Sequence, residues 1–71
     1  MKKSNSWEKV EGKWKQFSGE VKKQWGKFTD DEALEINGNR ENLSGKIQEK
    51  YGIAKEHADR QIDKWADKLK V

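Results

Sequence analysis

His57 is the only histidine of the sequence and the only side chain that ordinarily titrates near neutral pH. A general base needs a nucleophile or an orienting partner within reach, and the nearby acids, Glu56 and Asp59, are expected on other faces of the same helix. The absence of cysteine excludes thiol nucleophiles, thiolate metal sites and disulfides. No glycine-rich phosphate loop, nucleophile elbow or zinc spacing occurs. We therefore predict a protein that is not an enzyme and uses no cofactor.

Four acidic residues, Asp30, Asp31, Glu32 and Glu35, stand close together after Thr29. Calcium loops interleave their ligands over about twelve residues with a glycine at the turn, and that pattern is absent. Thr29 with Glu32 three positions later instead forms the signature of a capping box at a helix start. The pattern predicts a helix N-terminus and no metal site.

Lysines alternate with aromatic residues in the first half of the chain. Nucleic-acid-binding proteins use this combination, with lysines on phosphates and aromatic rings stacked on bases. The candidate contacts to an anionic surface are Lys13, Lys15, Lys22 and Lys23. The same helix could lie on a membrane surface if the domain opened. However, the aromatic residues belong to an apolar stripe, for which burial in a core is the simpler use.

The apolar residues follow helical periodicity throughout, and strand-like alternation is absent. The first stripe comprises Trp7, Val10, Trp14, Phe17, Val21, Trp25 and Phe28. Gly12 is placed to break off a short first turn, and Gly26 to end this helix. A short second helix follows Thr29, a third ends at Gly52, and a fourth begins at about Ile53. The sequence predicts an all-α bundle of about four helices.

An internal repeat with an offset of 26 residues organises the chain. Val10-Glu11-Gly12 corresponds to Ile36-Asn37-Gly38, and Phe17-Ser18-Gly19 corresponds to Leu43-Ser44-Gly45. Its signature residues are Gly12, Trp14, Gly19, Trp25, Gly26, Gly38, Gly45 and Gly52. The repeat predicts two duplicated α-hairpins packed orthogonally. A glycine inside a helix costs about 1 kcal/mol relative to alanine, and we expect another backbone of the monomer to approach Gly19 and Gly45 closely. The alternatives are a contact with a partner chain and a solvent-exposed duplicate, for which alanine would stabilise the domain.

Length and composition set the limits of the domain. Seventy-one residues, 41% of them charged, allow one small domain, here assigned to residues 6–69 after a disordered segment 1–5. The net charge of +3 divides into +5 for residues 1–28 and −2 for residues 29–71.

No apolar run approaches the ~20 residues that span a bilayer, and no signal peptide is evident. We expect a cytoplasmic monomer, and neither charge nor motif names a partner.

The run Trp25-Gly26-Lys27-Phe28-Thr29-Asp30-Asp31, together with Gly12-Lys13-Trp14-Lys15-Gln16, resembles the CsbD-like family of small bacterial stress-response proteins. The likeness continues through Gly45-Lys46-Ile47-Gln48-Glu49 and Tyr51-Gly52, and covers about residues 6–66. The resemblance implies a compact four-helix domain with an approximate duplication, a role in general stress responses, and no catalytic residues.

From the resemblance and the extreme hydrophilicity of the chain (mean hydropathy −1.34) we expect a non-enzymatic stress-response protein that acts through its surface, by solvation or weak binding. The alternative is a small nucleic-acid-binding module that uses the basic N-terminal helix.

Overall fold

The long apolar stripe predicted for the first helix is divided between two helices in the computed structural model, which describes residues 5–69. The helices are α1 (Asn5–Gly12), α2 (Trp14–Gln24), α3 (Asp30–Ile36), α4 (Arg40–Tyr51) and α5 (Lys55–Leu69). The described residues contain no strand, so the all-α prediction is confirmed. The predicted disordered segment 1–5 lies outside them, apart from Asn5, which belongs to α1.

The predicted count of four helices was wrong because the chain bends at Lys13, directly after Gly12. Lys13 leaves helical geometry with φ −119° and ψ 35°, and α2 restarts at Trp14. Glycine at the end of α1 favours this break, as the sequence indicated. Further along, α5 begins at Lys55, two residues later than Ile53.

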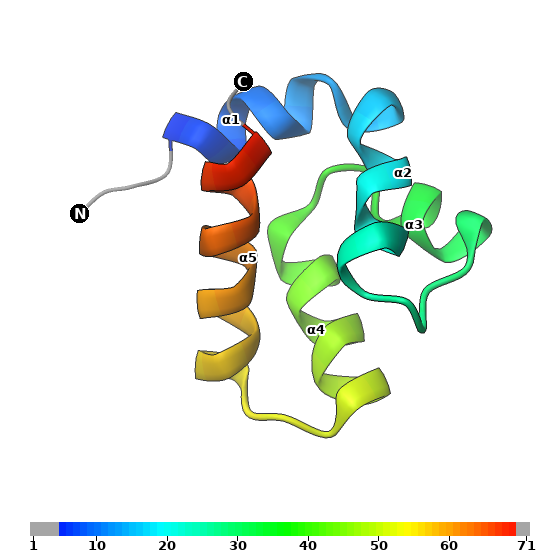
Figure 1. Cartoon of the computed structure of the whole chain (residues 1–71), viewed down its shortest axis with the longest axis vertical. Helices are drawn as coiled ribbons and strands as arrows, with labels where there is room; N and C mark the ends of the chain where they lie inside the picture. The colour runs from blue at the N-terminus through cyan, green and yellow to red at the C-terminus, as the bar shows by residue number, and fades with distance from the viewer. Residues whose placement is uncertain (1–4, 70–71) are drawn as a thin grey trace.

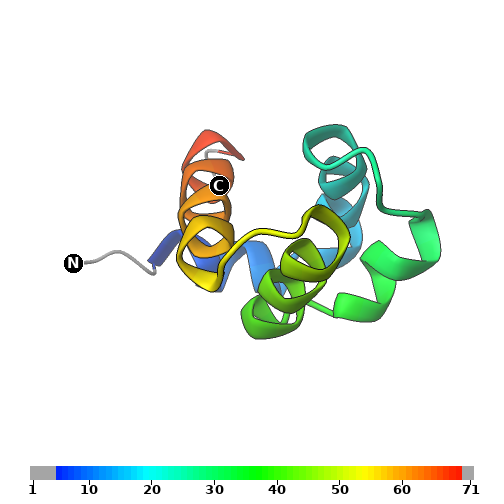
Figure 2. The ribbon, with the colours of Figure 1, turned by 90° about the horizontal axis from the view of Figure 1, so that it is seen from below.

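The five helices form two packed pairs and one crossing helix. α2 packs mainly against α3, and α4 packs against α5, while α1 lies across the C-terminal end of α5 (Figure 1). Seen from below, α5 stands on one side, α2 and α3 stand on the other, and α4 lies between them (Figure 2). This arrangement brings α1, α2 and α5 around a common interior.

Aromatic side chains fill that interior, with Trp65 of α5 at its centre. The ring centroid of Trp65 lies 5.3 Å from that of Trp25, 6.2 Å from that of Trp14 and 6.3 Å from that of Trp7. These separations suit the tilted and edge-on contacts that aromatic rings prefer. The buried apolar residues are Trp7, Val10, Trp14, Phe17, Val21, Trp25, Phe28, Ala33, Ile36, Leu43, Ile47, Ala58, Ile62, Trp65 and Ala66. The whole predicted apolar stripe of the N-terminal region is therefore core.

The turns between helices follow the predicted signals in part. Thr29 caps α3 through both hydrogen bonds of a capping box with Glu32, as predicted. Gly52 ends α4 in the left-handed conformation at φ 64°. Gly26 does not act as such a terminator, because α2 already ends at Gln24 and its C-cap, Trp25, is extended.

The expected close backbone approach at Gly19 and Gly45 is wrong. A Cβ atom added at either position would meet no heavy atom within 4 Å outside its own helical surroundings. Both glycines lie on exposed outer faces of α2 and α4. The only described glycine with a close approach is Gly38, where an added Cβ would lie 2.9 Å from Glu11 Cγ and 3.2 Å from Glu11 Cα.

Because open space surrounds them, Gly19→Ala and Gly45→Ala should each stabilise the domain by about 1 kcal/mol through restored helix propensity. For a domain of this size that gain raises the melting temperature by roughly 4–8 °C per substitution. Thermal melts followed by circular dichroism measure the effect. A fall in melting temperature for both variants would restore the close-approach interpretation.

Candidate functional site

The four lysines proposed as anionic-surface contacts are all exposed, but they do not form one free patch. Lys22 Nζ lies 3.0 Å from a carboxylate oxygen of Asp30, and Lys23 Nζ lies 3.5 Å from one of Glu20. Lys13, at the junction of α1 and α2, and Lys15 take part in no ion pair with the described residues. Two of the four cations are thus partly neutralised by neighbouring acids.

The aromatic rings that would stack on bases are buried, and their indole N–H groups hold the helices together. Trp14 Nε1 donates to the Ala33 carbonyl at 2.8 Å, and Trp7 Nε1 donates to the Gly38 carbonyl at 3.0 Å. Ala33 belongs to the last turn of α3, whose carbonyl groups lack helical partners, so Trp14 satisfies one of them. In the folded domain these rings are not available to nucleic-acid bases or to lipid.

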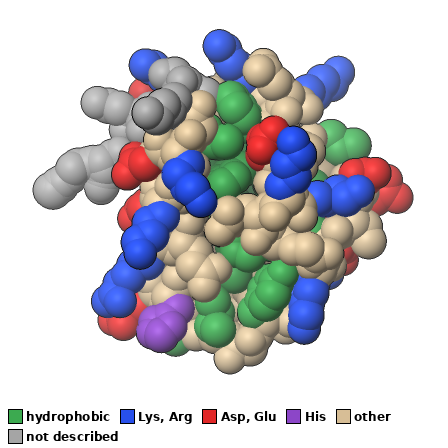
Figure 3. Space-filling model, viewed as in Figure 1, with side chains coloured by type: hydrophobic (Ala, Val, Ile, Leu, Met, Phe, Trp, Pro, Cys, Tyr) green, Lys and Arg blue, Asp and Glu red, His purple; other side chains and the backbone are tan. Residues whose placement is uncertain are grey.

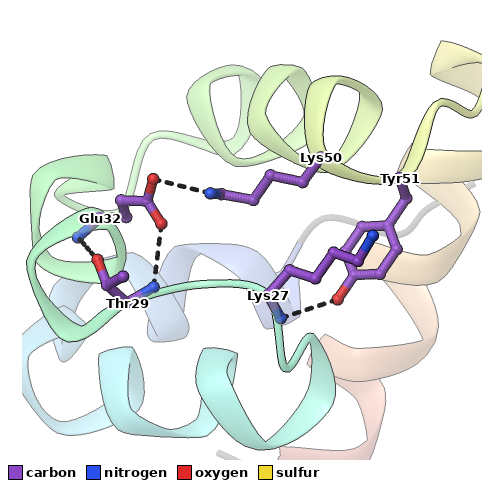
Figure 4. A network of polar contacts seen from close by, with 5 residues as sticks. All are labelled: Lys27, Thr29, Glu32, Lys50 and Tyr51. Carbon is purple, nitrogen blue, oxygen red and sulfur yellow. Dashed lines mark hydrogen bonds and ion pairs between the residues drawn. The ribbon is translucent and has the colours of Figure 1, made fainter.

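A network of polar contacts ties the loop between α2 and α3 to the end of α4 (Figure 4). Lys50 Nζ lies 2.7 Å from Glu32 Oε2, while the Thr29 N–H donates to Glu32 Oε1 at 3.0 Å. The Lys27 N–H donates to the Tyr51 hydroxyl at 3.2 Å. The Nζ of Lys27 also lies 5.3 Å from the centre of the Tyr51 ring, within cation–π range. This network positions the loop between α2 and α3 against the end of α4.

A second polar network joins α4 to α5. Arg40 Nη2 lies 2.6 Å from Asp63 Oδ1 and also donates to the Asp59 carbonyl at 3.3 Å. Within α5, Lys55 donates to the Asp59 carboxylate at 2.8 Å. The two contacts of Arg40 hold α4 against α5 along one flank.

His57 is exposed on α5. Within residues 5–69, no three His, Cys, Asp or Glu side chains gather closely enough to hold a metal ion. Two of the four acids considered for a metal site pair with lysines instead, Asp30 with Lys22 and Glu32 with Lys50. None of the five described helices is long and apolar enough to cross a membrane.

The sequence signature of the CsbD-like family matches residues 8–60. The UPF0337 protein YjbJ of Escherichia coli O6:H1 is 56% identical over 54 residues, which cover 76% of this chain and 78% of that protein. A UPF0337 protein of Pectobacterium atrosepticum is 48% identical over 84% of this chain and 87% of its own length. A UPF0337 protein of Rhodopseudomonas palustris is 52% identical over 90% of this chain and 97% of its own length. No solved structure matches.

The chain belongs to the CsbD-like family. The names of these relatives state no activity, substrate or partner. The residues of the CsbD-like motif can nevertheless be given physical roles in this chain. Trp25 and Phe28 enter the core, Thr29 caps α3, and Lys27 contacts Tyr51. The most specific run of the motif is therefore a structural connection.

Sequence reasoning missed the partners that complete this connection, Lys50 and Tyr51 among them. Glu32 and Lys50 are 18 residues apart, so no helical spacing rule pairs them. A signal was available in the Lys50-Tyr51 pair at the end of the repeat, because a lysine and an aromatic ring at a helix end commonly pack against a neighbouring loop.

The polar networks make the domain sensitive to acid. The hydrogen bond from Lys50, followed by that from the Thr29 backbone, lowers the pKa of Glu32 below its ordinary 4.5. For Asp59, burial raises the pKa, but the hydrogen bonds from Lys55 and Ser44 outweigh it, so its pKa lies below 3.8. A lowered pKa in the folded state contributes stability that is present above the unfolded pKa and is lost as pH falls through the folded pKa.

The melting temperature should therefore fall as the pH is lowered from neutral through these acidic pKa values. The matched variant is Glu32→Gln, which should melt below the parent at about pH 7 and close to it at about pH 2, where the parent carboxylate is also protonated. Melting curves across this pH range test the expectation. A constant difference between the two proteins at every pH would contradict it.

Proposed function

We propose that this chain is a non-enzymatic stress-response protein of the cytoplasm that acts through its hydrated, charged surface, by solvation or weak binding. The observation that carries the proposal is the separation of a largely apolar core from a charged surface. Among the described residues, Leu34 is the only large hydrophobic side chain classed as exposed, at 49%, although aromatic residues make up 10% of the sequence. No charged side chain among residues 5–69 is part of the buried core, and most of them face water.

Two further features support this proposal. The ion pair between Lys23 and Glu20 is exposed and lies within one helix, so it adds little stability. Oppositely charged groups are interspersed over a net charge of only +3, which favours solubility at high concentration over strong attraction to one partner. Such a surface suits a protein that accumulates to high concentration, retains water around itself and keeps other macromolecules from associating with one another.

We also propose that the fold arose by duplication. At the 26-residue offset, Val10 and Ile36 are both fully buried, and so are Val21 and Ile47. Gly19 and its counterpart Gly45 both border open space. Equal environments at equivalent positions are what a duplicated pair of hairpins should retain.

The test compares the parent with a variant of the same fold and net charge but fewer surface charges. The substitutions are Lys13→Gln, Lys15→Gln, Arg60→Gln, Glu35→Gln, Glu49→Gln and Glu56→Gln. Each of these residues is exposed, and none forms an ion pair with the described residues, so folding should be unaffected. The measurement is the activity that a drying-sensitive reporter enzyme retains after desiccation and rehydration in the presence of each protein.

The parent should preserve more reporter activity than an equal mass of an ordinary compact protein, and the six-site variant should preserve less than the parent. Equal protection by parent and variant, after equal melting temperatures have been established, would show that the surface charges are not the cause. If the abundance of the protein in its cell did not change under osmotic or desiccation stress, the stress-response part of the proposal would be wrong.

A further inference from the structure

The surface between α2 and α5 is hollowed on both sides of Trp65. The larger hollow, about 370 Å³, is lined by Gln24, Gln61, Lys64, Trp65, Asp67 and Lys68. A smaller one of about 190 Å³ is lined by Glu20, Lys23, Gln24, Trp65, Lys68 and Leu69. Gln24, Trp65 and Lys68 border both hollows, so together they form one groove, which we call the Trp65 groove.

The Trp65 groove combines an apolar floor with a basic rim. The exposed lining of the larger hollow is mainly apolar, and Leu69 adds a half-buried aliphatic side chain to the smaller one. Figure 3 shows a hydrophobic strip on this face, in the view in which α2 and α5 face the reader, with lysine side chains beside it. A floor of this kind suits a hydrocarbon chain.

The rim carries three lysines, Lys23, Lys64 and Lys68, beside two acids, Asp67 in the larger hollow and Glu20 in the smaller one. Lys64 and Lys68 form no ion pair with the described residues, and Lys23 has only an exposed contact of 3.5 Å with Glu20. Gln61 is fixed in place because its Oε1 atom accepts the Trp25 indole hydrogen at 2.8 Å. Its side-chain N–H₂ group therefore remains as a donor beside the two lysines.

We propose that the Trp65 groove binds a single-chain anionic amphiphile of the fatty-acid class. The hydrocarbon chain lies along the mainly apolar lining of the larger hollow, and the carboxylate is held by Lys68 and Lys64, with the Gln61 amide as a further donor. A bare anion would leave the apolar floor unused, and a neutral chain would leave the lysines unused, so charge complementarity selects the amphiphile. This binding goes beyond the proposed function, since protection by a hydrated surface requires no groove.

The probe is decanoate, added below micelle formation to the isotopically labelled full chain and followed by amide and indole NMR shifts. Acetate supplies the head group alone, and a neutral alkyl glucoside supplies a chain without charge. Lys64→Glu with Lys68→Glu removes the basic rim. Lys13→Glu with Lys15→Glu is the matched control, because it makes the same charge change on exposed, unpaired lysines outside the groove.

Decanoate should shift the signals of Gln24, Gln61, Trp65 and Lys68 at concentrations where acetate and the glucoside shift none of them. The rim variant should bind about tenfold more weakly, and the control should stay within about twofold of the parent. Equal weakening in both variants, shifts spread over the whole domain, or binding only to anionic vesicles and not to monomeric decanoate would each overturn the proposal. Melting temperatures of both variants establish that each remains folded.

Discussion

Replacing Trp65 with alanine should leave most of the chain unfolded at 25 °C. The Trp65 ring is 3% exposed and contacts the rings of Trp7, Trp14 and Trp25, so its removal leaves a cavity where α1, α2 and α5 meet. Truncating a buried tryptophan costs about 3–5 kcal/mol. A domain of this size rarely has a net stability above about 3–5 kcal/mol, so the substitution should remove most of the free energy of unfolding.

Far-UV circular dichroism and a urea titration measure this effect. Leu34→Ala is the matched surface control, because Leu34 is 49% exposed and its truncation should change stability by less than about 0.5 kcal/mol. The stability of Trp65→Phe should lie between those of Trp65→Ala and Leu34→Ala, because phenylalanine keeps an aromatic ring at the centre of the cluster. If Trp65→Ala unfolded at nearly the same urea concentration as the parent, the aromatic cluster would not be the core of the fold.

Gly38→Ala should destabilise the domain by about 2–3 kcal/mol, more than any other single glycine replacement among the described residues. Gly38 has φ +76°, a left-handed conformation that costs an alanine about 1–2 kcal/mol. Its new Cβ would also lie 3.2 Å from Glu11 Cα, a backbone atom that cannot rotate away. The displacement would disturb the hydrogen bond from Trp7 to the Gly38 carbonyl as well.

Gly52→Ala separates these two causes. Gly52 has a similar φ of +64° but nothing within 4 Å of an added Cβ, so its replacement should cost only the conformational part, about 1–2 kcal/mol. Equilibrium unfolding in urea gives both values under the same conditions. Equal losses for Gly38→Ala and Gly52→Ala would mean that the contact with Glu11 adds nothing.

Much of the fold followed from the sequence because its signals are local. The apolar stripe from Trp7 to Phe28 is buried as its spacing predicted, and Thr29 with Glu32 forms the capping box that its pattern predicted. The CsbD-like motif was also sufficient to assign the family, and the comparison with known relatives confirms that assignment.

The features that could not be predicted depend on how helices meet in space. The break at Lys13 lets both Trp7 and Trp14 reach carbonyl groups near the end of α3, which no pattern within the first stripe specifies. The free space at Gly19 and the tight contact at Gly38 are likewise set by tertiary packing. Helical spacing places a glycine on a face but does not say which element covers that face.

The exposure of the four candidate lysines was predictable from the sequence, but their ion pairing was not. Lys13, Lys15, Lys22 and Lys23 are exposed as expected, but the pairing of Lys22 with Asp30 crosses from α2 to α3 and becomes visible only when the two helices are packed. For the aromatic residues of the same segment, the sequence left two uses open, which were stacking on nucleic-acid bases and burial in the core. In the folded structure these aromatic residues are buried, so they belong to the core.

The most direct test of a surface-acting protein is the accessibility of its four tryptophans to acrylamide quenching, with and without single-stranded nucleic acid and anionic vesicles. Every tryptophan is at most 7% exposed, so the account predicts weak quenching and blue-shifted emission that neither addition changes. Quenching as strong as that of free tryptophan, or an emission shift on adding nucleic acid or vesicles, would contradict it. Such a result would mean that the rings leave the core to stack on bases or enter lipid.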